Sequence, residues 1–179
     1  MKKQVVITCL LLTVIFPTSS GQLHAAHFSP SGGGSAQVYF SPAGGATGAM
    51  ISQIGGARSE ILVMAYAFRS QAIAQALIAA HQSGVKVEIL MDKSERQEGF
   101  TPVTMATNAG IPVWLDGRHA AMNNRVIIID HKIVITGSFN FNSASEEMNA
   151  ENLLVVQSAE LAKSYRENWL IHQKHSEKY

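Results

Sequence analysis

The sequence predicts an α/β sandwich in which a mixed, mostly parallel β-sheet is flanked by helices. Residues 60–68 (EILVMAYAF) are apolar on both faces, as expected of a central strand. Apolar residues then recur at helical spacing over 73–80, between Ser70, which can cap a helix, and Gly84, which can end one. Residues 85–91 are predicted to form the next strand. A strand, a helix and a strand in this order predict a right-handed crossover and a parallel pair at the sheet centre.

The earlier elements are predicted by turn residues and apolar spacing. Residues 37–40 indicate a short strand, which Ser41-Pro42 turns into a helix that Gly55-Gly56 ends. After a charged loop over 92–99, we expect a short helix over 103–108 and a strand over 113–115.

The later elements surround a short hairpin. We expect its strands over 126–129 and 133–135, a loop over 146–149 and a further strand over 152–156. An amphipathic helix over 159–173 closes the chain. Its stripe of Leu161, Tyr165 and Trp169 is interpreted as core or as a dimer contact.

The chain of 179 residues, 46% hydrophobic, can bury one sizeable core, which we place at residues 37–179. Residues 1–25 have the layout of a signal peptide: two lysines precede an apolar run, and processing is expected after Ala25, or alternatively after Gly21. The apolar run over 5–16 is too short to span a bilayer. We therefore expect an exported protein, periplasmic or secreted, without stable membrane insertion. Residues 26–36 are expected to form a flexible leader.

The single cysteine and the net charge limit which classes of function fit the sequence. Cys9 is the only cysteine in the sequence and lies in the predicted signal peptide, so the exported form should contain no disulfide. The formal net charge is +1, and removal of Lys2 and Lys3 leaves 12 basic against 13 acidic residues, near −1. Overall charge therefore gives no support to nucleic-acid binding, and any affinity for phosphate must come from a local cluster.

Polar residues of several chemical types lie in and around the predicted hairpin. Asn123 and Arg125 are two residues apart and so point the same way, and Asp130 begins the turn. Gly137-Ser138 follows the second strand, where a backbone can approach a ligand closely. Polar groups are therefore expected to converge at one end of a buried hairpin.

These residues resemble the motif of the phospholipase D superfamily. That motif is a His, one residue, a Lys, four residues, an Asp, six residues, then Gly-Ser and an Asn two further on. The spacing matches at every step, with Asn123 at the position of the nucleophilic His and Arg125 at that of the Lys. The segments YFSP, MAYAF, IPV and GSFNF resemble the small exported bacterial endonucleases of the superfamily. The matching positions are Asn123, Arg125, Asp130, Gly137, Ser138 and Asn140, with Glu151 as the downstream acid.

The resemblance implies a mechanism and an assembly. In this family one His attacks the phosphorus to give a phosphohistidine, and a His from a second motif protonates the leaving oxygen. The chain has one motif and no internal repeat, so a homodimer with a shared, isologous site is implied. No metal or cofactor is implied. By position, Asn123, Arg125, Asp130 and Glu151 form the catalytic set, and Arg125, Gly137, Ser138 and Asn140 hold the phosphodiester.

The substitution at Asn123 changes the expected chemistry. An amide nitrogen is delocalised into its carbonyl and is neither basic nor nucleophilic. Arg125 remains a planar, bidentate phosphate ligand. In a symmetric dimer the nucleophile and the general acid are lost together, which predicts an impaired or inactive enzyme.

Several histidines and basic residues outside the motif are further site candidates. His119 and His131 could replace the nucleophile only within ~3 Å of the phosphorus approach line, and we interpret both as surface residues near the rim. His172 and His175 have the spacing of a metal-ligand pair, but without a third ligand a solvated helix end is preferred. Arg118 with Lys132 is a candidate phosphate-tracking pair, and the loop over 92–99 is interpreted as solvated.

Three functions are compatible with these observations. The first is a metal-independent, non-specific endonuclease on DNA or RNA, impaired by Asn123. The second is a catalytically silent nucleic-acid or phosphate-binding homodimer. The third is a phospholipase D acting on lipid head groups, which the absence of a lipid-binding loop disfavours.

Overall fold

A computed structural model describes residues 26–28, 34–96, 99 and 101–179 of the chain. The predicted signal peptide lies outside the described residues. In chain order the elements are β1 (Ala26–Phe28), β2 (Ser35–Ser41), α1 (Ala46–Gly56), β3 (Glu60–Ala65), α2 (Gln71–Gln82), β4 (Lys86–Asp92), a 3₁₀ turn η1 (Lys93–Glu95), α3 (Pro102–Asn108), β5 (Val113–Asp116), β6 (Arg125–Ile129), β7 (Ile133–Gly137), α4 (Ser143–Glu147), β8 (Glu151–Gln157), α5 (Ala159–Gln173) and β9 (Glu177–Lys178).

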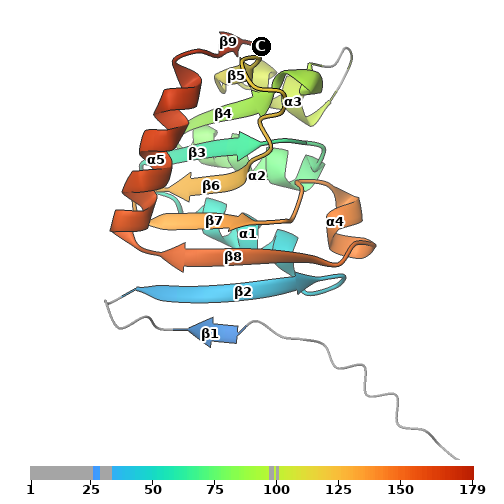
Figure 1. Ribbon diagram of the computed structural model, residues 1–179, viewed down its shortest axis with the longest axis vertical. Helices are drawn as coiled ribbons and strands as arrows, with labels where there is room; N and C mark the ends of the chain where they lie inside the picture. The colour runs from blue at the N-terminus through green and yellow to red at the C-terminus, as the bar shows by residue number, and fades with distance from the viewer. Residues whose placement is uncertain (1–25, 29–33, 97–98, 100) are drawn as a thin grey trace, which may run out of the picture.

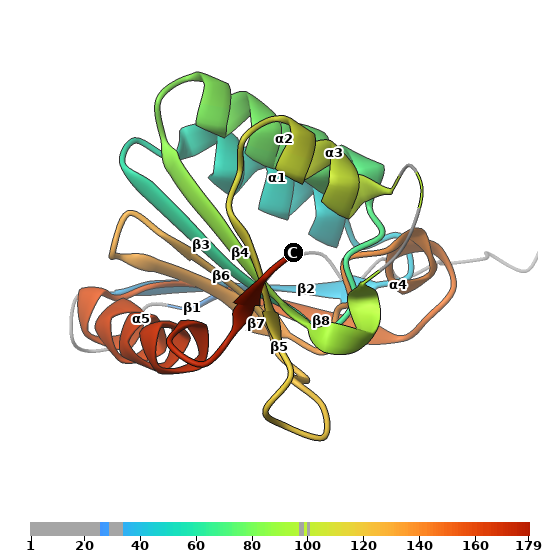
Figure 2. The same ribbon diagram turned by 90° about the horizontal axis from the view of Figure 1, so that it is seen from above.

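The strands form one nine-stranded sheet in the order β1-β2-β8-β7-β6-β3-β4-β5-β9 (Figure 1). Helices α1, α2 and α3 cover one face and α5 covers the other (Figure 2). The predicted mixed sheet between helices is confirmed. The prediction that most of the strands are parallel is corrected, because among the described strands only β3–β4 and β4–β5 pair in parallel. The β6–β7 hairpin, which is antiparallel by its short connection, inserts beside β3, and β8 and β2 continue the antiparallel arrangement.

The helices begin where the sequence supplies a cap. Ser70 accepts a hydrogen bond from the backbone N–H of Ile73 at the start of α2, as predicted. Thr101 and Thr104 form a reciprocal capping box at α3, next to Pro102. The short helix α4 includes residues 146 and 147, which were predicted to belong to a loop over 146–149. Its Glu146 carboxylate accepts hydrogen bonds from the first amides of α1, so α4 and α1 are joined.

Each face of the sheet has its own apolar cluster because side chains alternate along the strands. Ile61 and Val63 face α1, α2 and α3, whereas Leu62 and Met64 face α5. Trp169 of α5 is buried and donates its indole N–H to the carbonyl of Val63, 3.0 Å away. The core interpretation of the α5 stripe is therefore confirmed for Trp169.

The predicted flexible leader over 26–36 differs from the structure at both ends. Ala26–Phe28 forms β1, which pairs antiparallel with β2, and β2 already begins at Ser35. β8 pairs with one edge of β2, so the other edge of β2 can pair with β1. Within the described residues, no helix has the length and apolar character needed to cross a bilayer.

Candidate functional site

The β6–β7 hairpin places the motif residues at two opposite ends of its strands. Its turn places Asp130 and His131 in the left-handed region, with φ of 51° and 56°, as a tight hairpin turn requires. Arg125 begins β6 and Asp130 follows its last residue, so the two are roughly 16 Å apart along the strand. Arg125 pairs in register with Ala65 at the carboxyl end of β3. The motif polar groups other than Asp130 therefore gather at this end of the sheet.

Gly137 brings β7 unusually close to β8. It has φ of 157°, and a Cβ at this position would lie 2.2 Å from the carbonyl oxygen of Asn152. The same carbonyl accepts the backbone N–H groups of Ser138 and Phe139 at 3.1 and 3.3 Å. The close approach predicted at Gly137-Ser138 is therefore to the neighbouring strand, and it fixes the position of the Ser138 side chain.

The segment after Gly137 alternates between core and surface. Phe139 and Phe141 are each 1% exposed and anchor the segment, and Phe141 packs edge-on against Phe68 with ring centroids 6.4 Å apart. Ser138 precedes Phe139 and Asn140 lies between the two anchors, so both polar side chains alternate with the buried rings and point the other way. The buried phenylalanines thus set the direction of the two polar side chains.

Arg125 is held by neutral acceptors. Its Nε donates to the Oδ1 of Asn140 at 2.7 Å, and its Nη1 donates to the Oδ1 of Asn123 at 2.9 Å. The guanidinium also lies over the ring of Tyr66, 5.7 Å from its centroid. Within the described residues, no carboxylate forms an ion pair with Arg125. The hydrogen-bond partners of Arg125 in the described residues are therefore all uncharged.

Glu151 closes the other side of the cluster. Its carboxylate accepts hydrogen bonds from the hydroxyl of Ser138 and from the side-chain amide of Asn149, the latter at 3.1 Å. The backbone N–H of Asn152 donates to the same Ser138 hydroxyl at 3.1 Å. The buried Ser145 joins this group to the Arg125 group, because its hydroxyl accepts the backbone N–H of Asn140 at 3.1 Å and donates to Glu151 at 3.5 Å.

Comparisons with known proteins identify the family to which the chain belongs. A family model described as the cardiolipin synthase, phospholipase D-like domain matches residues 50–170, more than half of the chain. The chain belongs to the phospholipase D superfamily. It is 37% identical over 154 residues to a phospholipase D of Rickettsia prowazekii, covering 86% of this chain and 75% of that protein. It is 46% identical over 118 residues to a phospholipase D of Rickettsia bellii, but there the match covers 66% of this chain and 59% of the relative's length.

Two solved structures share the fold. Nuc, a phospholipase D family member from Salmonella typhimurium, superposes with a TM-score of 0.76 at 36% identity, covering 82% of this chain and 98% of Nuc. NucT from Helicobacter pylori gives a TM-score of 0.75 at 23% identity, covering 82% and 99%, a likeness that shows the fold alone. The phospholipase D superfamily is a family of phosphodiesterases, so the cluster lies in a chain of that family.

Asp130 is separated from the other motif residues and has a structural role here. Its carboxylate accepts the backbone N–H groups of Arg58, Ser59 and Glu60 and the Ser59 hydroxyl, at 2.8 to 3.1 Å. Burial tends to raise the pKa of Asp130, but the hydrogen bonds from Ser59, Glu60 and Arg58 outweigh it and hold the pKa below its usual value. Asp130 therefore ties the hairpin turn to the α1–β3 connection, and it does not lie beside the other residues that were predicted to be catalytic.

Neither candidate replacement histidine lies beside Arg125. His131 is in the β6–β7 turn, at the opposite end of the hairpin, 3.5 Å from the Glu60 carboxylate. His119 directs its Nδ1 to the Oδ2 of Asp116 at 3.0 Å. Lys132 shares the turn with His131, whereas Arg118 lies beyond β5, so the suggested Arg118–Lys132 pair spans two distant regions of the sheet.

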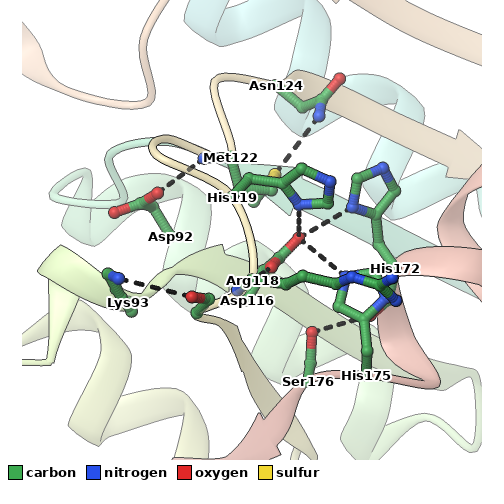
Figure 3. Close-up of polar contacts among 11 residues, drawn as sticks. Asp92, Lys93, Asp116, Arg118, His119, Met122, Asn124, His172, His175 and Ser176 are labelled. Carbon is green, nitrogen blue, oxygen red and sulfur yellow. Dashed lines mark hydrogen bonds and ion pairs between the residues drawn. The ribbon is translucent and has the colours of Figure 1, made fainter.

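A second polar cluster lies at the carboxyl end of β5 (Figure 3). The Oδ2 of Asp116 is 3.0 Å from His119 Nδ1, 2.8 Å from His172 Nδ1 and 3.3 Å from His175 Nε2. Burial tends to raise the pKa of Asp116, but hydrogen bonds from His172, the Arg118 backbone and the other two rings hold it well below its usual range. The interpretation of His172 and His175 as a solvated helix end is therefore wrong.

Of the two residue pairs that form this cluster, only His172 and His175 were recognised from the sequence as a metal-ligand spacing. Asp116 and His119 are three residues apart, as are His172 and His175, but the two pairs lie far apart along the chain. They meet because β9 pairs antiparallel with β5 and so returns the end of α5 to Asp116. Because β9 is only two residues long, no sequence pattern predicted that pairing.

Proposed function

We propose that this chain binds nucleic-acid phosphodiesters at the Arg125 cluster and is impaired in cleaving them. The observation that carries the proposal is the contact between Arg125 Nη1 and the Oδ1 of Asn123. Because a guanidinium only donates hydrogen bonds, the amide oxygen must face it, and the amide nitrogen has no lone pair for attack on phosphorus. The phosphohistidine step of the superfamily has no nucleophile at this position.

The binding half of the site supports the same proposal. Arg125 carries a positive charge that no carboxylate within the described residues pairs with, and the Oδ1 of Asn140 accepts from its Nε at 2.7 Å, so the amide nitrogen of Asn140 can still donate to a ligand. An anionic phosphodiester oxygen would accept from the guanidinium and from this amide in a charge-assisted arrangement, and the Ser138 hydroxyl, which donates to Glu151, would have to turn to join them. Neither the identity of the sugar nor a base sequence is read by such contacts, so DNA and RNA are both expected to bind.

The proposal includes a homodimer that joins two such clusters. The chain has one motif, and exposed apolar side chains lie at the same end of the sheet: Phe40 is 38%, Tyr66 37% and Met148 78% exposed. Phe40 pairs in register with Asn152, next to Glu151, which places it beside the cluster. Covering these side chains with a second copy would bury apolar surface and bring two Arg125 groups to one substrate. Export by the predicted signal at residues 1–25 is part of the same proposal.

The decisive experiment is cleavage of plasmid DNA in the presence of a chelator. The original chain is compared with a double variant, Asn123→His with Arg125→Lys. We expect cleavage by the double variant to exceed that of the original by at least about 10³-fold, because a nucleophile is restored. Asn124→His with Arg125→Lys is the matched control, since it places an imidazole one residue out of register, and it should remain inactive.

Binding is measured in parallel by fluorescence anisotropy with labelled DNA. The original chain should bind, and its affinity should fall steeply between about 50 and 200 mM salt as phosphate contacts release counterions. Cleavage by the original chain at the rate of the double variant would contradict the proposal. Binding that does not change with salt would also count against it.

A second candidate substrate is a phospholipid head group. It is favoured by the relatives, which include a phospholipase D of Rickettsia felis at 44% identity and a mitochondrial cardiolipin hydrolase of Mus musculus at 29% over 113 residues. The double variant is therefore also incubated with phospholipid vesicles. Head-group release without DNA cleavage would select this candidate.

A further inference from the structure

We propose that Asp116, His119, His172 and His175 form a zinc-binding site. The four side chains each offer one ligand atom, and these atoms all lie within 4.8 Å of one another. The site lies at β5 and the end of α5, three strands away from Arg125 in the sheet order. It is separate from the phosphodiester cluster, and the proposal does not depend on the proposed function.

The donor set fits a divalent transition metal. Three imidazole nitrogens and one carboxylate oxygen are borderline ligands of the kind that zinc accepts in tetrahedral sites. With metal–ligand bonds near 2.0–2.1 Å, tetrahedral ligand atoms lie about 3.3 Å apart. The three distances from Asp116 Oδ2 to the ring nitrogens, 2.8 to 3.3 Å, are already close to this separation. Only the separations between rings must shorten for a cation to contact all four.

A cation also explains the arrangement better than hydrogen bonding does. The Oδ1 of Asp116 already accepts the backbone N–H of Arg118 at 2.9 Å, and all three rings point to Oδ2 (Figure 3). One carboxylate oxygen offers about two lone pairs, so it cannot accept three well-aligned N–H groups. Neutral imidazoles that direct lone pairs to a shared cation satisfy all four groups. Asp116 is fully buried, and His172 and His175 are each 17% exposed, so a bound ion would be largely shielded from water.

The positions of the ligands give the site a structural role. Asp116 ends β5, His119 lies in the connection 117–124, and His172 and His175 lie at the carboxyl end of α5. Four protein ligands leave no open position, as in structural zinc sites. Zinc would join the end of α5 to the connection that leads directly into Asn123 and Arg125. It would therefore fix the start of the motif without touching the substrate.

Zinc binding is tested on protein purified without a polyhistidine tag and stripped by a chelator. Calorimetric titration with Zn²⁺ should show one equivalent per chain, and Co²⁺ in its place should give the visible spectrum of a tetrahedral site. His119→Ala is the principal variant, because its side chain is 45% exposed and its loss should leave the fold intact. We expect it to weaken zinc affinity at least tenfold. His172→Ala should do the same.

His131→Ala is the matched control, since His131 is an exposed histidine far from the cluster. It should bind zinc like the original chain. Zinc should raise the melting temperature of the original chain and of His131→Ala by several degrees, and that of His119→Ala by less. No saturable binding at one equivalent, or equal affinity in the original chain and His119→Ala, would overturn the proposal. Because no nucleic acid is present, this outcome is independent of the cleavage experiment.

Discussion

Gly137 shows how a single position sets the geometry of the site. A methyl group there would meet the Asn152 carbonyl at 2.2 Å, and the φ of 157° is strained for any other residue. Gly137→Ala must therefore push β7 away from β8 and displace Ser138. We expect a loss of about 2–4 kcal/mol in the free energy of unfolding, measured by urea denaturation.

The control is Gly48→Ala in α1. A Cβ at Gly48 would meet no atom within 4 Å, and the helix interior favours alanine. This variant should be stabilised by about 0.5–1 kcal/mol. If both variants changed stability by the same amount, the close approach of β7 to β8 would not be the cause.

The sequence predicted the position of those site residues whose arrangement depends only on their spacing along the chain. Asn123 and Arg125, two residues apart, were predicted to point the same way, and their side chains are in contact although Asn123 precedes β6. The role of Asp130 was not predictable from its spacing in the motif. Whether a carboxylate five residues after Arg125 faces the site or the opposite end of the strand depends on the hairpin, and its partners Arg58 and Ser59 come from a distant part of the chain.

At the scale of elements, Asp130 anchors the β6–β7 hairpin to the start of β3. Asp130→Asn should weaken this anchor, because an amide is a poorer acceptor than a carboxylate for several N–H groups. We expect a loss of about 1–2 kcal/mol at neutral pH, reduced from the ideal value by solvent screening. Urea unfolding of both proteins measures it, and Glu147→Gln, an exposed acid of α4, is the control.

The loss should depend on pH in a defined direction. The pKa of Asp130 is lower in the folded chain than in the unfolded chain, where it is near 3.9. Its contribution is therefore complete above about pH 5 and disappears as the pH falls through the folded pKa. The stability difference between the original chain and Asp130→Asn should be constant from pH 7 to about pH 5 and then shrink. A difference that grew in acid would contradict this role.

The elements that the sequence predicted are those with strong local patterns. The helix over 159–173 has the predicted bounds, and the hairpin turn lies at 130–132 as expected. The elements that were missed are all short: β1 and the 3₁₀ turn η1 have three residues each, β9 has two and α4 has five. Such short elements depend on tertiary partners, as β9 depends on β5 and α4 on the amides of α1.

At the scale of the whole molecule, the exposed apolar side chains near the motif predict self-association. Met148 is 78% exposed directly after α4, and the next residue, Asn149, donates its side-chain amide to Glu151. Met148→Glu would place two like charges against each other across an isologous interface and desolvate both. We expect the original chain to sediment as a dimer at micromolar concentration and Met148→Glu to shift toward monomer, with a dissociation constant raised at least tenfold.

The control is Ile171→Glu, which changes an exposed apolar residue of α5, 59% accessible and away from the motif. It should remain dimeric. Loss of the dimer should also weaken DNA binding, because each chain carries one Arg125 cluster and two clusters on one backbone bind with a high effective concentration. A Met148→Glu protein that stayed dimeric would place the interface elsewhere. A monomeric variant that bound DNA as tightly as the original chain would show that one cluster is sufficient, and the shared-site arrangement would then be wrong.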